Sequence, residues 1–435
     1  MRKPLLLGVA IFSTLGCGQV ASDGASSAGG SGGVASAVVE PAGTGGQSLG
    51  DSSPGNAGTG TVNGCPSPSA SAGILDATFG LAGVSRVVED PTSVSRILAD
   101  LALASDGSVF VLGANDHGTV VFHLNANGAL DTAFGDAGFV WGPSLENPYA
   151  LTLDPNGNLL LAGDSAGSAW VQRLTPKGEL DTSFGMAGRT DLQWAGSDHF
   201  VKVLVKRDGS LVAIGTLLGL LDQNGVPLPD VGSMHEWGLP GVVPIGPIAA
   251  DAVEQADGAI LMVGVVQETE DPPQAHPFWM KVDARGIPDS TFNRYPTPGL
   301  IDVPMQSSSA IAITTDAKGG VTGWGSNRNQ LTAFDEHGTA TAFSSPSVLD
   351  AHSVAIDCAG RVFAAGSKAV GGRTTAALAR FQPTGALDTS FAKSGVAIWE
   401  AGEYSSFSRV RGLPDGRVLV AGVASKAFVV ARYQP

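Results

Sequence analysis

Beyond residue 72, apolar and polar positions alternate in short segments that are typical of β-strands rather than helices. In one unit, the apolar run 159–162 follows an Asn156-Gly157 turn, and residues 169–174 then alternate between apolar and polar side chains. Asn-Gly and Asp-Gly pairs supply the positive φ angles that tight turns between antiparallel strands need. No apolar pattern of helical period extends over three turns. The folded part of the chain is therefore predicted to be all-β.

This unit occurs seven times, which is the strongest structural signal in the sequence. In each copy a turn glycine is followed six residues later by a second glycine, and successive turn glycines lie 41 to 61 residues apart. Four short strands per unit, repeated seven times, favour a seven-bladed β-propeller of four-stranded antiparallel blades. An open solenoid is the alternative, but it would show shorter, more uniform repeats and capping ends. The turn glycines are Gly107, Gly157, Gly209, Gly258, Gly319, Gly360 and Gly416.

A second motif, built on Leu-Asp and a phenylalanine, lies between the units and is predicted to form the fourth strand. The folded part begins with this element at residues 73–79 and ends after a third strand at 427–433. We therefore expect the N-terminal strand to complete the last blade and close the ring, leaving no edge unpaired. The clear copies contain Asp76, Asp131, Asp181, Asp289 and Asp388, and two eroded copies are Leu228-Pro229-Asp230 and residues 340–343.

The two motifs together resemble a known repeat. Residues 128–138 have the form Gly-x-Leu-Asp-x-x-Phe-Gly-x-x-Gly, and residues 415–422 have the form Asp-Gly-x-apolar-apolar-Val-x-Gly. This pattern resembles the delta-60 repeat of bacterial surface and secreted proteins and covers nearly all of residues 73–435. The resemblance implies an extracytoplasmic propeller-like repeat protein, and it implies no reaction and no catalytic residues.

The repeated residues of the motif are expected to have structural roles. The aspartates are predicted to accept backbone N–H groups in turns. The phenylalanines are predicted to fill the seams between blades. A calcium ion takes six to eight oxygen ligands, whereas each copy offers one fixed acid, so no metal site is predicted. The phenylalanines are Phe79, Phe134, Phe184, Phe292, Phe343 and Phe391.

The first 17 residues are predicted to be an export signal. Arg2 and Lys3 precede the apolar run 5–12, which is too short to span a bilayer permanently. Residues 13–17 resemble the lipobox of bacterial lipoproteins, which implies that Cys17 is lipidated and anchors the protein at the cell envelope, in the outer membrane. Thr14 stands where the lipobox has an apolar residue, so ordinary cleavage and secretion is the alternative.

Residues 18–72 are predicted to be a disordered linker. They are almost entirely Gly, Ala, Ser, Thr and Pro, and such a composition buries too little apolar area to offset chain entropy. A flexible coil of this length reaches on the order of 40 Å. With Cys17 assigned to the lipid, only Cys65 and Cys358 remain, and they are a candidate disulfide in an oxidising compartment.

Charge and motif spacing narrow the function. A formal net charge of -15 without a basic cluster argues against nucleic acid, and leaves the lipid as the only membrane contact. The sequence Gly163-Asp164-Ser165-Ala166-Gly167 matches a hydrolase nucleophile elbow, but here a strand leads into another strand rather than into a helix. The seven histidines show no metal-binding spacing, so no cofactor and no catalytic residue are predicted.

Function is expected on the face whose loops vary between units. Aromatic residues in these loops are candidates for contacts with a glycan or protein partner, and the favoured alternative is that they pack under the loops as seam fillers. The preferred hypothesis is a monomeric, non-catalytic binding or structural module with an unknown ligand. The alternative is a lyase or glycosidase with paired carboxylates at the central channel. The candidate aromatics are Trp141, Tyr149, Trp194, Trp237, Trp399 and Tyr404.

Overall fold

The computed structural model describes the folded part of the chain, and all described residues belong to one compact unit, Ala37–Pro435. Cys17, Cys65 and Cys358 lie outside the described residues, as do residues 18–70 of the predicted linker, whereas Ala72 at its end is buried in the core. Within the described part, no helix is long and apolar enough to cross a membrane. The described residues are 71–142, 146–192, 199–228, 234–236, 248–255, 257–267, 275–289, 292, 300–302, 309–315, 321–327, 330–334, 340–345, 348–357, 359–401 and 404–435.

The described residues form seven sheets, each with four antiparallel strands in sequential order. We number the sheets one to seven by the position of their first strand in the chain. Sheets one to three comprise β2 (Arg96–Leu103), β3 (Val109–Asn115), β4 (Gly118–Leu124) and β5 (Phe139–Trp141); β6 (Glu146–Leu153), β7 (Leu159–Ser165), β8 (Ser168–Leu174) and β9 (Arg189–Leu192); and β10 (Phe200–Val205), β11 (Leu211–Gly215), β12 (Leu217–Leu221) and β13 (Met234–Glu236).

Sheets four to seven follow the same order, except that the fourth strand of sheet seven is β1. They comprise β14 (Ile248–Glu254), β15 (Ile260–Gln267), β16 (Ala275–Val282) and β17 (Leu300–Asp302); β18 (Ser309–Thr315), β19 (Val321–Asn327), β20 (Gln330–Phe334) and β21 (Ala340–Ser345); β22 (Asp350–Ile356), β23 (Val362–Val370), β24 (Arg373–Phe381) and β25 (Val396–Trp399); and β26 (Ser405–Gly412), β27 (Val418–Ala424), β28 (Ala427–Tyr433) and β1 (Val84–Val87). A short 3-10 helix spans Phe391–Lys393.

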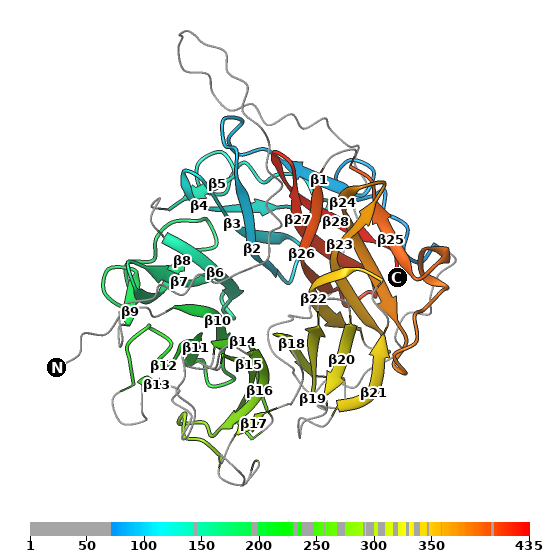
Figure 1. The fold of residues 1–435 in the computed structure, drawn as a ribbon. Coiled ribbons are helices and arrows are strands. Elements are labelled where there is room, and N and C mark those ends of the chain that lie inside the picture. The colour runs from blue at the N-terminus through cyan, green and yellow to red at the C-terminus, as the bar shows by residue number, and fades with distance from the viewer. Residues whose placement is uncertain are drawn as a thin grey trace, which may run out of the picture. The chain divides into compact units, whose positions relative to one another are not determined.

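The first strands of the sheets form a closed ring. Each contacts the first strand of the next sheet, in the order β2, β6, β10, β14, β18, β22 and β26, and β26 contacts β2 again. The fold is thus the predicted seven-bladed β-propeller (Figure 1). The contact between β26 and β2 excludes the open solenoid.

The two ends of the folded part close the ring by pairing with each other. β1 pairs with β28 in antiparallel register from Val84↔Ala431 to Val87↔Phe428. In Figure 1 this blue strand lies beside the red strands of sheet seven. The predicted closure by N- and C-terminal strands is confirmed. We call residues 71–87 together with β28 the latch.

A turn within the latch is divided between the chain ends. In sheet one the turn from β4 is continuous, with Asn125 N–H bonded to Ala129 O (2.8 Å) and Gly128 N–H bonded to Asn125 O (2.7 Å). In sheet seven, Gln434 N–H bonds to Ile74 O (2.8 Å) and Gly73 N–H bonds to Gln434 O (3.1 Å). The same pair of hydrogen bonds therefore forms here between segments that are not covalently joined.

The prediction that the Leu-Asp motif forms the fourth strand is wrong in most sheets. Residues 180–184 form a turn that has a single isolated bridge to β8, Leu174↔Leu180, in place of strand pairing, and β9 begins later, at Arg189. Asp181 bends the chain by accepting the Ser183 N–H (3.1 Å), and Gly188, with φ of 100°, turns it back. Likewise, β1 begins at Val84 rather than at residue 73. Among the described strands, only β21 of sheet five begins at the motif, at Ala340.

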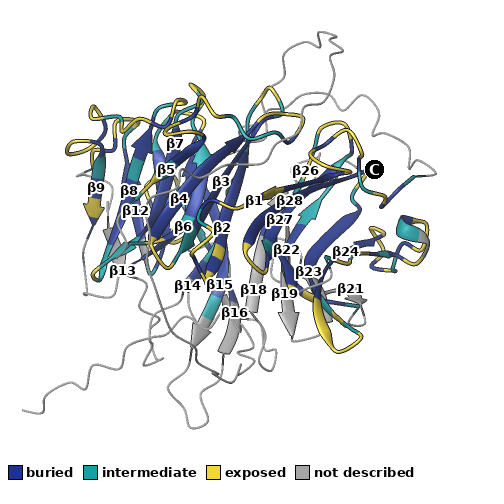
Figure 2. Ribbon diagram, turned by 90° about the horizontal axis from the view of Figure 1, so that it is seen from above, coloured by how far each residue is buried: buried dark blue, intermediate teal, exposed yellow. Residues whose placement is uncertain are grey.

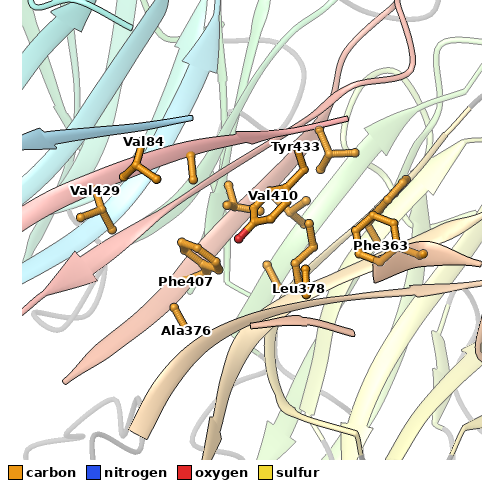
Figure 3. Close-up of a cluster of buried hydrophobic side chains, with 14 of the residues drawn as sticks. Val84, Phe363, Ala376, Leu378, Phe407, Val410, Val429 and Tyr433 are labelled. Atoms are coloured by element: carbon orange, nitrogen blue, oxygen red, sulfur yellow. The ribbon is translucent and has the colours of Figure 1, made fainter. Parts of the chain in front are cut away.

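The hydrophobic core lies in the seams between neighbouring sheets. Between sheets six and seven, Phe363 and Leu378 pack with Phe407 and Val429, and all four side chains are fully buried (Figure 3). Figure 2 shows buried residues concentrated in the strands and exposed residues at the connections. Burial at about 25 cal/mol per Å² of apolar surface makes these seams the main stabilising term. The first strands are thereby held around a common axis.

Candidate functional site

The aspartate of the repeated Leu-Asp motif forms an ion pair with a basic side chain, which was not predicted from the sequence. In sheet two, Asp181 Oδ2 lies 2.7 Å from Arg173 Nε, at the end of β8. The Arg173 guanidinium also lies over the Phe184 ring, 4.8 Å from its centroid. Asp181 and Phe184 thus hold one arginine from two sides, by an ion pair and a cation–π contact. The Ser183 hydroxyl and N–H together lower the pKa of Asp181, although burial opposes this effect.

The same arrangement recurs around the ring. Arg380 lies over Phe391 at 4.9 Å and Arg432 over Phe79 at 4.7 Å. In four of the pairs the basic residue (His, Arg or Lys) stands eight residues before the aspartate, at the end of the third strand. Alignment of those strand ends could have identified this residue. The predicted bonds from backbone N–H groups to the aspartates are confirmed for Asp76, Asp131, Asp181 and Asp388. The pairs are His123–Asp131 (2.9 Å), Arg173–Asp181 (2.7 Å), Lys281–Asp289 (3.5 Å), Arg380–Asp388 (2.8 Å) and Arg432–Asp76 (2.7 Å).

These clusters also join each sheet to the next one. Arg173 Nη1 donates to Gln223 O of sheet three (2.8 Å), and Arg432 Nη1 donates to Ala126 O of sheet one (2.7 Å). A Cβ atom on Gly225 of sheet three would lie 2.5 Å from the Phe184 ring, and Gly225 has a φ of 79°. Glycine is therefore required there both for the turn and for the ring that packs beneath it. The predicted role as seam fillers is confirmed for Phe79, Phe134, Phe184, Phe292 and Phe391, and the side chain of Phe343 lies outside the described part of the structure.

Sheet three replaces the ion pair with two leucines. The bridge Leu221↔Pro227 corresponds to Leu174↔Leu180, which places Leu220 at the arginine position and Leu228 at the aspartate position. Leu228 N–H bonds to Leu220 O (3.0 Å), as Asp181 N–H bonds to Arg173 O (3.0 Å). The interpretation of Asp230 as the motif aspartate is therefore wrong, because the bridge fixes a different register. Both positions of the pair are therefore apolar in sheet three and charged in sheet two.

A ring of equivalent positions surrounds the axis. Each first strand has a register irregularity at the same place, and the residue after it occupies what we call the axial position. Successive axial residues can bond across the seams, because their strands are adjacent. The axial residues are Asp100, Ala150, Lys202, Asp251, Ala312, Ser353 and Arg409.

The polar axial residues link neighbouring sheets. Asp100 Oδ2 accepts the Leu151 N–H of sheet two (3.2 Å) and Asp251 Oδ2 accepts the Ile313 N–H of sheet five (3.2 Å). Lys202 Nζ lies 2.8 Å from Asp251 Oδ1. The alternative hypothesis of an enzyme placed carboxylates at the centre. Two carboxylates do occupy axial positions, and each pairs with a cation and with backbone N–H groups.

The two ends of the sheets differ in regularity. One end, which we call the turn face, carries the repeated turns, for example Ala104 N–H to Ser108 O (2.9 Å) and Lys206 N–H to Ser210 O (2.8 Å). The other end, which we call the loop face, is where first strands begin and fourth strands end. Two of the candidate aromatics are exposed on the loop face, Trp141 at 44% and Tyr404 at 40%. They belong to neighbouring sheets, one and seven.

The other described candidate aromatics are partly packed. Trp399 stacks on Phe407 with ring centroids 6.1 Å apart, and Arg86 lies over it at 5.9 Å, so it extends a seam. The centroids of the Tyr149 and His199 rings are 5.8 Å apart. Burial raises the pKa of the Tyr149 hydroxyl, and the nearby Asp164 carboxylate raises it further. Trp194 and Trp237 lie outside the described residues.

Two arrangements that look nucleophilic have structural explanations. Ser165 ends β7 and pairs with Ser168 in a hairpin, so the strand-to-helix elbow is not formed. Ser406 Oγ lies 3.3 Å from His352 Nδ1, but that nitrogen is 3.0 Å from Phe407 O and must donate to it. It therefore cannot accept the serine proton. Among the described residues, no group of three or more His, Cys, Asp or Glu could hold a metal ion.

Comparisons with known proteins bear on the fold. The family model described as a domain of unknown function (DUF5122) beta-propeller matches residues 360–391, which include the whole of β23 and β24 and the following motif. No curated protein matches the chain. Virginiamycin B lyase from Staphylococcus aureus is similar in structure, with a TM-score of 0.49 and 12% identity over 80% of this chain and 98% of that one. Kuenenia stuttgartiensis hydrazine synthase has a TM-score of 0.48 and 12% identity, over 80% and 99%.

Proposed function

We propose that this chain is an exported delta-60 repeat lipoprotein that acts as a non-catalytic binding module through its loop face. Cys17 in the lipobox-like segment is the predicted anchor, and residues 18–72 hold the propeller away from the membrane. The ligand is a protein or glycan outside the cytoplasm. In this proposal the export signal anchors the protein, the linker spaces the propeller from the membrane, and the propeller binds the ligand.

One observation carries the proposal: the repeated residues are used within the fold, while exposed aromatics are found where the sheets differ. Asp181 and its counterparts bind cations in the seams, and Phe184 packs under the next sheet. Trp141 and Tyr404 stand exposed on the loop face. Binding sites are commonly carried on variable loops above a regular scaffold, and Trp and Tyr are enriched among residues that dominate binding energy.

The binding site is tested by screening the purified chain against glycans and envelope proteins, and then comparing variants. Trp141→Ala and Tyr404→Ala should each weaken binding by about tenfold or more, as expected for a residue central to an interface. The control is Met186→Ala on the turn face, because Met186 is 87% exposed and lies in a motif turn. Binding that survives both loop-face changes but is lost in the control would contradict the proposal.

The anchor is tested separately in cells. Cys17→Ser should abolish lipid labelling and release the protein from the membrane fraction. A Cys65→Ser variant is the matched control and should stay anchored. If Cys17→Ser leaves the membrane association unchanged, the lipoprotein assignment fails while the binding proposal stands.

A further inference from the structure

Two arginines of β26, the axial Arg409 and the nearby Arg411, share one axial carboxylate, that of Asp100. Arg411 Nη2 lies 2.9 Å from Asp100 Oδ1, and Arg409 Nε lies 3.5 Å from the same oxygen. Both arginines come from β26, two residues apart. Lys202 and Asp251 neutralise each other at 2.8 Å. The cluster of Asp100, Arg409 and Arg411 therefore carries a net positive charge inside a chain with a net charge of -15.

The carboxylate has little capacity left for either arginine. Asp100 Oδ1 also accepts the Leu101 N–H at 2.9 Å, and Oδ2 accepts the Leu151 N–H at 3.2 Å. A guanidinium offers five N–H donors. Arg409 Nη1 is bonded to Ser408 O and Arg411 Nη1 to Val410 O. Several donors of each guanidinium therefore remain for a further acceptor.

These arginines are inside the ring and yet reachable by solvent. Their side chains are 32% and 34% exposed, whereas Asp100 is 7% exposed. Burial lowers the pKa of Arg409, Asp100 opposes this, and the neighbouring charge of Arg411 lowers the pKa further. Asp251, the axial residue of sheet four, also raises it. An anion placed here would relieve the repulsion between the two guanidinium groups.

We propose that Arg409 and Arg411 form an oxyanion site at the axis of the propeller, which binds a carboxylate or phosphate group of a small ligand. Planar guanidinium groups bind such oxyanions through paired N–H donors, which a lysine cannot reproduce. Asp100 holds both arginines in position while leaving their outer donors open. The site is separate from the loop face, so its failure would leave the proposed binding by the loop face untouched, and the reverse also holds.

Calorimetric titration of the full chain tests the site, with inorganic phosphate in one arm and succinate in the other at constant ionic strength. We expect saturable binding of one anion per chain in at least one arm, and the arm identifies the source. Arg411→Gln should weaken it by about tenfold or more. The control is Arg285→Gln, since Arg285 is 64% exposed and pairs only within its own turn, with Asp283. Absence of saturable binding in both arms, or equal binding by Arg411→Gln, would overturn the proposal.

A second variant, Asp100→Asn, tests the site independently if Arg411→Gln folds poorly. Asp100→Asn removes the competing negative charge but keeps an oxygen that can accept the Leu151 N–H. The site predicts tighter anion binding by Asp100→Asn, by about threefold or more, even though the ring is destabilised. A purely structural arginine pair predicts lower stability without tighter binding, and that result would also overturn the proposal.

Discussion

Sheets seven and three occupy equivalent positions in the ring and fill the same place with opposite chemistry. In sheet seven, Arg432 and Asp76 form a buried ion pair at 2.7 Å. In sheet three, Leu220 and Leu228 stand at these positions. The backbone bond is kept in both, since Asp76 N–H bonds to Arg432 O (2.7 Å) and Leu228 N–H bonds to Leu220 O (3.0 Å). The geometry of the motif therefore does not depend on the charges.

Arginine–aspartate pairs also occur in sheets two and six, where the turn is continuous, so the comparison of sheets seven and three concerns what the pair adds where the two chain ends meet. In sheet three the turn between the paired residues is a continuous chain, with Asp222 N–H bonded to Val226 O (2.8 Å). In sheet seven the corresponding turn is divided between the chain ends. A buried ion pair stabilises little compared with apolar packing, but it is selective for its partner. We infer that the Asp76 cluster, which also includes Arg417 at 2.8 Å, selects the strand that closes the ring.

The largest effect is expected from removing the N-terminal part of the latch. Deleting residues 73–87 leaves β28 with an unpaired edge and removes Phe79 from the seam with sheet one. We expect loss of cooperative unfolding of the whole propeller, measured by calorimetry. An equally long deletion within residues 18–70 is the control and should leave the unfolding temperature unchanged. A latch deletion that melts like the intact protein would refute ring closure.

A smaller effect is expected from introducing half of the charged pair into sheet three. Leu228→Asp alone places a carboxylate without a cation in the seam and should cost about 3–5 kcal/mol in the free energy of unfolding. The double variant Leu220→Arg with Leu228→Asp should recover at least half of this loss. Denaturant unfolding measures both. If the double variant is less stable than Leu228→Asp, the two positions are not equivalent to Arg432 and Asp76.

The smallest effect is expected from acid. Burial opposes the ionisation of Asp76, but bonds from Thr78 and Arg417 and the charge of Arg432 outweigh it and lower its pKa from 3.8 to about 2. The folded pKa lies below the unfolded value, so this contribution is complete above pH 4 and is lost as the pH falls toward 2. It amounts to about 2 kcal/mol. The stability difference between the wild type and Asp76→Asn should shrink over that range, and a constant difference would contradict the assignment.

The fold could be predicted from the sequence because the repeats, the turn glycines and the point in the repeat at which the folded part begins and ends are all visible as local patterns. The pattern at residues 180–184 gave the wrong strand, since an Asp-centred turn and a strand share the same apolar spacing there. The basic partner of each aspartate was not predicted, because Arg173 and its counterparts lie at the end of the third strand, outside the Leu-Asp motif. The axial pairing of Asp100 with Arg411 was beyond reach, because it joins residues 311 positions apart.

A double-mutant cycle between Asp76 and Arg432 tests the central claim most directly, because these residues belong to the two chain ends that close the propeller. The variants are Asp76→Asn, Arg432→Gln and the pair, each unfolded in denaturant at neutral pH. We predict a coupling free energy of at least about 1 kcal/mol. Additive effects, with a coupling near zero, would mean that the two ends are not locked together in solution.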